Sequence, residues 1–141
     1  MKYIKIEQTE LGFSLDPTAY LDRLEAIAAQ LPPGAAAFAR EPGHYAFGDR
    51  CPKDLKLDRA SLVGTALELS FVGYTPEPRL VIRYDGVVSF TAAADEGEDD
   101  LGRVQLDEIL PHDRGCRHEI KLIAGTVAVV CADLTAKWTL P

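Results

Sequence analysis

From Asp54 onward, apolar and polar residues alternate along the chain in short runs, and this period of two constrains the fold more than any other feature. Successive side chains of a β-strand point to opposite faces, so such alternation predicts strands with one buried face. The runs follow one another through short turns, with no helical stretch to carry a parallel crossover, so we expect an antiparallel sheet of about six to eight strands. The clearest alternating positions are Leu55 and Leu57, then Leu67, Leu69 and Phe71, then Leu80, Ile82 and Tyr84.

Two dipeptides predict how these strands pair. Asp85-Gly86 lies between the runs RLVIRY and VVSFTA, and an Asp-Gly pair between two alternating runs is a strong hairpin signal. Ala124-Gly125 predicts a second tight turn, across which the stretch 127–131 pairs back onto residues 117–123. Lys137 to Thr139 is predicted to form the last edge strand.

The first 50 residues are predicted to be helical. Asp16-Pro17-Thr18 is typical of a helix start, and apolar residues at three-and-four spacing continue to Leu31, where Pro32-Pro33-Gly34 is expected to end the helix. The run AAAFAR predicts a second, shorter helix. The expected fold class is therefore α+β: an N-terminal helix or two packed on a curved, mainly antiparallel sheet. Residues 1–141 are expected to form a single domain, helical over 1–50 and β-rich over 51–141.

Charge and cysteine usage limit the partners and the compartment. The chain has 22 acidic and 15 basic residues, a net charge of −7, which argues against binding nucleic acid and predicts a basic partner. Charges interrupt the short apolar runs of residues 1–15, so we expect no secretory leader, and no apolar run is long enough to predict a membrane helix. Cys51, Cys116 and Cys131 form an odd set without paired spacing, so we expect reduced thiols in a cytoplasmic protein.

The strongest charge feature is the run from Asp95 to Asp100. It places five carboxylates in six positions, and residues 71–141 hold 12 acidic against 7 basic residues, so −5 of the net charge lies in the β-rich half. Three interpretations stay open: a calcium loop, a solvated hairpin loop, or a docking surface for a basic protein. The run lacks the alternate-oxygen spacing of an EF-hand. The candidate partner-binding residues are Asp95, Glu96, Glu98, Asp99 and Asp100.

A cluster of possible metal or catalytic residues lies in the segment PHDRGCRHE. His112, Cys116 and His118 are suitable metal ligands, and His44 and Cys51 are available to complete a tetrahedral site. A Cys-His nucleophile pair is a second use of the same residues. The alternative is a polar turn that leads into a strand with Cys116 buried. The spacing matches no known zinc pattern, so we assign no metal, cofactor or catalytic residue.

The remaining acidic candidates are Asp107, Glu108 and Asp113. They offer a carboxylate pair for acid/base chemistry, or else cap a short helical turn or lie on an exposed edge. The chain contains no GxGxxG, GxxxxGK[ST], GxSxG or HExxH motif. These observations favour a non-enzymatic domain.

Three segments in order, RLVIRYDGVVSFTA, LDEILPHDRGCRHEIKL and GTVAVVCADLTAKW, carry a family resemblance. Over roughly residues 54–139 the chain resembles small, mostly uncharacterised bacterial α+β proteins grouped with the immunity proteins of polymorphic toxin systems. It departs from several of them at Lys53-Asp54, where they have a His-Asp pair. The resemblance implies a protein that neutralises a cognate toxin by binding it. The other hypotheses are a small-ligand, metal-binding or enzymatic domain with a site near His112, Cys116 and His118, and a housekeeping domain whose acidity serves only solubility.

Overall fold

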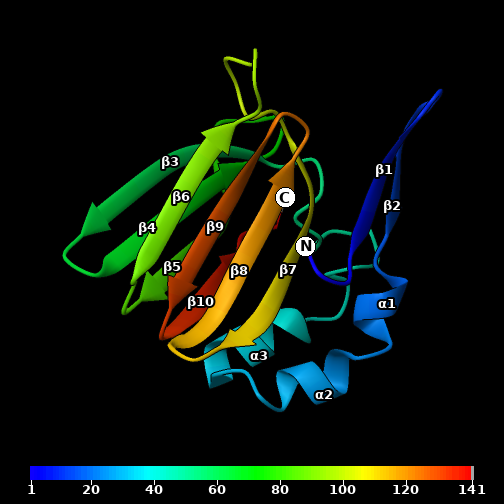
Figure 1. The fold of residues 1–141 in the computed structure, drawn as a ribbon. Coiled ribbons are helices and arrows are strands. Elements are labelled where there is room, and N and C mark those ends of the chain that lie inside the picture. Colours follow the sequence, from blue (N-terminus) through cyan, green and yellow to red (C-terminus); the bar gives the residue numbers. More distant parts are fainter. Residues whose placement is uncertain (141) are drawn as a thin grey trace.

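The computed structural model describes residues 1–140, which form ten strands and three short helices (Figure 1). The first five strands are β1 (Lys5–Thr9), β2 (Gly12–Asp16), β3 (Lys56–Val63), β4 (Ala66–Val72) and β5 (Pro78–Asp85). The other five are β6 (Ser89–Ala94), β7 (Val104–His112), β8 (Gly115–Leu122), β9 (Gly125–Cys131) and β10 (Asp133–Trp138). The helices are α1 (Thr18–Leu21), α2 (Leu24–Ala28) and α3 (Pro33–Ala39).

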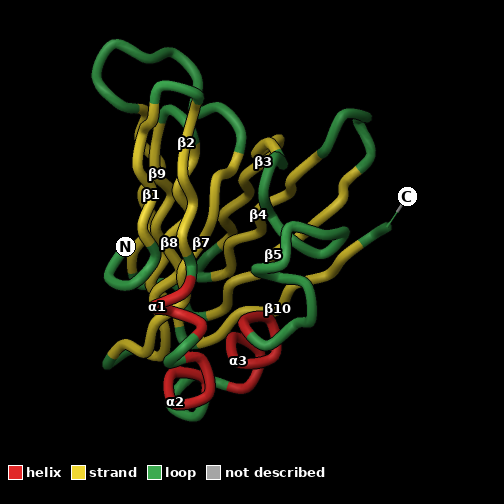
Figure 2. The backbone as a smooth tube through the Cα atoms, turned by 90° about the vertical axis from the view of Figure 1, so that its right-hand side faces the viewer, coloured by secondary structure: helices red, strands yellow, loops and turns green. Residues whose placement is uncertain are grey.

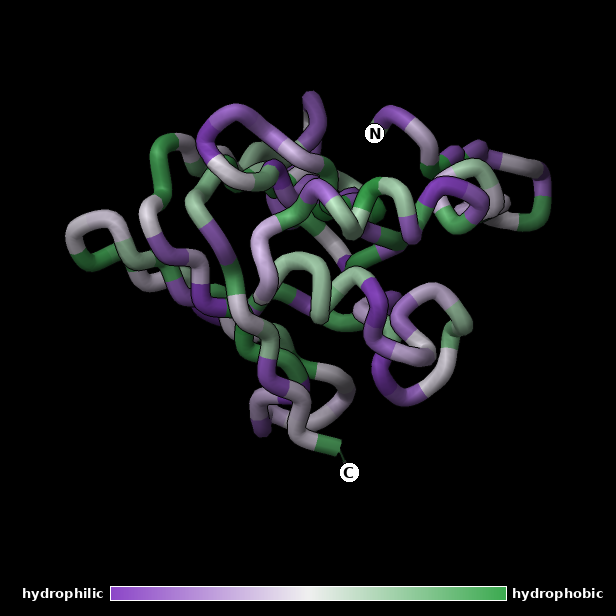
Figure 3. The backbone as a smooth tube through the Cα atoms, turned by 90° about the horizontal axis from the view of Figure 1, so that it is seen from below, coloured by the Kyte–Doolittle hydropathy of each residue, from purple (hydrophilic) through white to green (hydrophobic). Residues whose placement is uncertain are grey.

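The strands form two four-stranded sheets and a separate hairpin. The sheet orders are β10-β5-β4-β3 and β6-β9-β8-β7, and β1 pairs with β2 alone. Every pairing among residues 1–140 is antiparallel, as predicted. The two larger sheets face each other and bury their alternating apolar residues between them. Seen from below, hydrophilic and hydrophobic residues alternate along much of the backbone (Figure 3).

The predicted α+β architecture, with one or two helices packed on a single curved sheet, is wrong. The three helices are only 4, 5 and 7 residues long, which is too short to cover a sheet face. They gather instead at one end of the two sheets (Figure 2). The apolar face of each sheet is covered by the other sheet, and the domain is predominantly β-structure.

Asp85-Gly86 is a corner between the two sheets, so the predicted hairpin is also wrong. Strand β5 pairs with β4 and β10, whereas β6 pairs with β9. The β9–β10 connection changes sheets at the same place, where the Ala132 backbone N–H donates to the Asp85 carbonyl at 2.9 Å. Gly86 has a φ of +63°, and a Cβ added there would lie 2.8 Å from the Cβ of Ala132. A glycine is needed because the two corners cross closely.

The other turn predictions have mixed outcomes. Residues 117–123 and 127–131 pair across Ala124-Gly125 as the β8–β9 hairpin, and β10 is an edge strand, as predicted. The helix expected to run to Leu31 is broken into α1 and α2. Pro32-Pro33-Gly34 starts α3 as well as ending the preceding segment, because proline is tolerated in a first helical turn.

Helix α3 lies very close to β10. Asp133 accepts hydrogen bonds from the backbone N–H groups of Gly34 and Ala35 at 3.0 and 2.9 Å. A Cβ at Gly34 would lie 1.9 Å from the carbonyl oxygen of Leu134, so only glycine permits this approach. No helix within residues 1–140 has the length and apolar character needed to cross a lipid bilayer.

Candidate functional site

The acidic segment, residues 95–100, connects β6 to β7 and projects beyond the ends of the strands (Figure 1). All five of its carboxylates are exposed. Asp95 lies 3.8 Å from Lys121 Nζ, and Asp100 lies 3.3 Å from Lys56 Nζ. Hydrogen bonds from the Gly102 N–H and from Lys56 lower the pKa of Asp100. Within residues 1–140, no basic group lies within 4.0 Å of the other three carboxylates, Glu96, Glu98 and Asp99.

A groove of about 630 Å³ opens beside the acidic segment, between β1 and the outer face of β8, and we name it the β1 groove. Residues 4–8 form one wall. Glu119, Lys121 and Ile123 contribute to its floor, and Asp95 is shared with the acidic segment. The β1 groove and the acidic segment therefore form one continuous surface.

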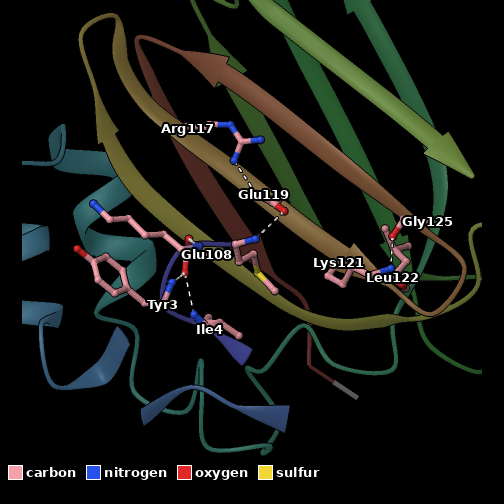
Figure 4. Close-up of polar contacts among 10 residues, drawn as sticks. Tyr3, Ile4, Glu108, Arg117, Glu119, Lys121, Leu122 and Gly125 are labelled. Carbon is pink, nitrogen blue, oxygen red and sulfur yellow. Dashed lines mark hydrogen bonds and ion pairs between the residues drawn. The ribbon is translucent and has the colours of Figure 1, made fainter. Parts of the chain in front are cut away.

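Two charged side chains on the floor are already partnered (Figure 4). Lys121 Nζ donates to the carbonyl oxygens of Leu122 and Gly125 at 2.7 and 3.1 Å. Glu119 accepts from Arg117 at 2.6 Å and from the Met1 nitrogen at 3.2 Å. Burial raises the pKa of Glu119, but these two donors outweigh burial and leave its pKa below the ordinary value.

Glu108 holds the chain that precedes β1. Its Oε1 accepts from the Lys2 N–H at 2.8 Å, and its Oε2 accepts from the N–H groups of Tyr3 and Ile4 at 2.8 and 2.9 Å (Figure 4). Glu108 is only 2% exposed. Charge-assisted hydrogen bonds of this kind are among the stronger polar contacts in proteins, so Glu108 ties the beginning of the β1 wall to β7.

The residues predicted as a possible metal or catalytic cluster do not converge. His112 lies at an exposed turn, where its Nδ1 accepts from the Arg114 N–H at 3.1 Å. Cys116 is fully buried, with its Sγ 3.7 Å from Sγ of Cys131 on the neighbouring strand. His118 shares the buried face of β8 with Cys116. Among the described residues, no group of three or more His, Cys, Asp or Glu side chains is arranged so that it could hold a metal ion.

A buried polar network joins His44, one of the proposed ligands, to His118. His44 Nε2 lies 2.7 Å from Asp107 Oδ1, and His118 Nε2 lies 2.7 Å from Asp107 Oδ2. The remaining ring nitrogens contact the Phe38 carbonyl at 2.8 Å and the Tyr84 hydroxyl at 2.7 Å. The network links α3 and both sheets in the interior.

The partners of His44 determine its protonation. A carbonyl and an ionised carboxylate only accept hydrogen bonds, so both ring nitrogens of His44 donate and the imidazole is cationic. Burial lowers the pKa of His44, but the charge and hydrogen bond of Asp107 outweigh it, and the pKa is raised. Burial raises the pKa of Asp107, and the two histidines more than offset this, so the pKa is lowered.

None of the roles predicted from the sequence for Asp107 and Glu108 anticipated that both side chains are buried. Both lie in β7, at 1% and 2% exposure, so they neither cap a helical turn nor lie on an exposed edge. Asp107 belongs to the buried polar network with His44, and Glu108 faces the N-terminal segment. Asp113 is exposed in the next turn. The sequence carries no signal for this burial; in the structure, a register irregularity between Val104 and Leu106 lies just before Asp107.

Comparison with known proteins does not assign the chain to a family. No protein-family model, curated protein or solved structure matches the chain. The resemblance to polymorphic-toxin immunity proteins therefore stays a prediction.

Proposed function

We propose that this chain is a non-enzymatic domain that binds a basic protein through the acidic segment, as an immunity protein binds its toxin. The observation that carries the proposal is the exposed group Glu96, Glu98 and Asp99, whose carboxylates have no basic group within 4.0 Å among residues 1–140. The β-rich half that carries them has a net charge of −5, from 12 acidic and 7 basic residues.

The physical role of such a segment is to accelerate capture. A cluster of like charges raises the rate at which an oppositely charged protein arrives, and apolar contacts then set the lifetime of the complex. A toxin that grips nucleic-acid phosphates has a basic surface, which is the surface that this segment would attract. The effect weakens as salt screens the charges.

The burial of the titratable groups supports a binding role over an enzymatic one. His44, Asp107, Cys116 and His118 are each 1% exposed or less, so a substrate in solvent does not reach them. The three cysteines form no disulfide in the structure, which is compatible with a reducing compartment. We place the domain in the cytoplasm, where an immunity protein would meet its toxin.

The test compares two variants of equal charge. The first replaces the five acids of the segment, as D95N/E96Q/E98Q/D99N/D100N. The matched control neutralises five exposed acids elsewhere, as E10Q/D22N/D49N/D58N/D113N. Tagged wild-type chain captures a partner from lysate of the source cell, and stopped-flow association of that purified partner is then measured from low to high salt.

The proposal predicts that the segment variant slows association and flattens its salt dependence, whereas the control keeps most of the wild-type rate. Survival of cells that express the captured partner, measured with and without this chain, would then test neutralisation. Equal association rates for the two variants would overturn the role of the acidic segment, as would capture of an acidic partner.

A further inference from the structure

Strand β1 has one edge that pairs with β2 and one that is free. Thr9 and Gly12 close a two-residue hairpin loop, and such a closing pair exchanges both of its backbone hydrogen bonds. The pattern then alternates, so Lys5, Glu7 and Thr9 bond to β2 while the N–H and C=O groups of Ile6 and Gln8 point to the other edge. Nothing within residues 1–140 hydrogen-bonds to those groups outside the β1–β2 ladder.

The free edge of β1 faces the β1 groove. Side chains of a strand alternate between its two faces, so a cavity above one face touches every second residue. The β1 groove touches the consecutive residues 4–8, as a cavity does when it runs along an edge, and it also reaches Phe13 of β2, the cross-strand partner of Gln8. Figures 1 and 2 show the hairpin standing beside the β7 edge of its neighbouring sheet.

The floor of the groove suits an extended chain. Glu119, Lys121 and Ile123 line it at a spacing of two, which is the repeat of a strand lying above them. Gln105 also lines it, is 4% exposed, and has a buried Nε2 without a hydrogen-bond partner in the described part of the chain. At about 630 Å³ the groove has the size of an ordinary ligand site.

We propose that an extended segment of the partner protein enters the β1 groove and adds to the free edge of β1 as a third strand. This inference rests on the proposed function, because the same partner would first meet the acidic segment. Main-chain hydrogen bonds to Ile6 and Gln8 would supply affinity, as in other complexes formed by strand addition. The charged groups that line the groove balance, with Lys5, Lys121 and the Met1 nitrogen against Glu7, Asp95 and Glu119. The preference for Lys or Arg in the entering segment therefore comes from the adjacent acidic segment, which shares Asp95 with the groove.

The experiment uses the whole chain and a displayed library of random dodecapeptides as the probe. Enriched peptides are synthesised, and hydrogen exchange of the Ile6 and Gln8 amides is followed by NMR with and without each peptide. Gln8→Pro removes one free-edge N–H without breaking the β1–β2 ladder, since proline is tolerated on sheet edges. Gln8→Ala is the matched control, because it keeps the backbone N–H.

Strand addition predicts peptides enriched in Lys or Arg that slow exchange at Ile6 and Gln8. It also predicts about tenfold weaker binding to Gln8→Pro and unchanged binding to Gln8→Ala. The exchange measurement on the wild-type chain stays decisive even if proline loosens the hairpin. No enriched peptide, or peptides that leave both amides unprotected, would overturn the proposal. Peptides that leave those amides unprotected but lose affinity in the five-acid segment variant would overturn strand addition alone and leave the proposed function standing.

Discussion

The Nε2 atom of His44 lies 2.7 Å from the Oδ1 atom of Asp107, and both side chains are 1% exposed. This ion pair joins the turn after α3 to β7 across a large separation in sequence. The second oxygen of Asp107, Oδ2, lies 2.7 Å from His118 Nε2, so both carboxylate oxygens have a hydrogen-bond partner. A pair this deeply buried makes the stability of the fold depend on the protonation of its members.

We expect stability to fall on both sides of a maximum at mildly acidic pH. The pKa of His44 is raised in the folded chain, so its contribution is full below the unfolded value of about 6.5 and is lost as the pH rises through the folded pKa. The pKa of Asp107 is lowered, so its contribution is present above about 3.8 and is lost as the pH falls through the folded pKa. Urea unfolding measured from about pH 2 to about pH 9 covers the alkaline limb and the onset of the acid limb.

Two variants separate the contribution of His44 to the pH dependence of stability from that of other titrating groups. His44→Gln removes the group that releases its proton at alkaline pH and should flatten that limb of the profile. His112→Gln alters an exposed histidine and should leave the profile unchanged. An alkaline limb that persists in His44→Gln would contradict the assignment to His44.

Asp107→Asn should destabilise the fold by about 3 to 5 kcal/mol at pH 7, because it leaves the His44 cation buried without its counter-charge. Asp113→Asn removes an equal charge from an exposed turn and should change the free energy of unfolding by less than about 0.5 kcal/mol. Chemical denaturation of the two variants side by side makes the comparison. Equal small losses would mean that the buried network contributes little.

Glu108→Gln should loosen the segment before β1. An amide side chain keeps only one acceptor oxygen, whereas the two carboxylate oxygens accept from Lys2, Tyr3 and Ile4. We expect faster hydrogen exchange at those three amides and a loss of about 1 to 3 kcal/mol in the free energy of unfolding. Glu10→Gln, at the exposed hairpin tip, is the control. Unchanged exchange at all three amides would show that the segment is held by other contacts.

Gly34→Ala should separate α3 from β10. The added Cβ would lie 1.9 Å from the Leu134 carbonyl oxygen, which is backbone and does not rotate away. Overpacking of this kind costs about 1 to 3 kcal/mol. Gly48→Ala places a Cβ where no atom lies within 4 Å and should be close to neutral. Thermal unfolding distinguishes them, and a neutral Gly34→Ala would contradict the close approach.

Some parts of the fold follow from neighbouring residues alone. The β8–β9 hairpin was predictable because its two alternating runs are joined by Ala124-Gly125, and the pairing partner is the next strand along the chain. The β1–β2 hairpin lay in a segment predicted to be mainly helical, and its alternation is too short to stand out beside the helix signal at Asp16-Pro17-Thr18. The candidate site shows the same division: the acidic segment is visible in the sequence, whereas the β1 groove is not.

Sequence by itself determined that the chain after Asp54 forms antiparallel strands and that its acidity concentrates at residues 95–100, because alternation and charge are properties of neighbouring residues. Only the tertiary structure decided that Asp85-Gly86 turns between two sheets, since β9, and not β5, supplies the partner of β6. It also decided that Asp107 is buried between two histidines. Strand partners and burial depend on residues that are distant in the chain and meet only when both sheets assemble.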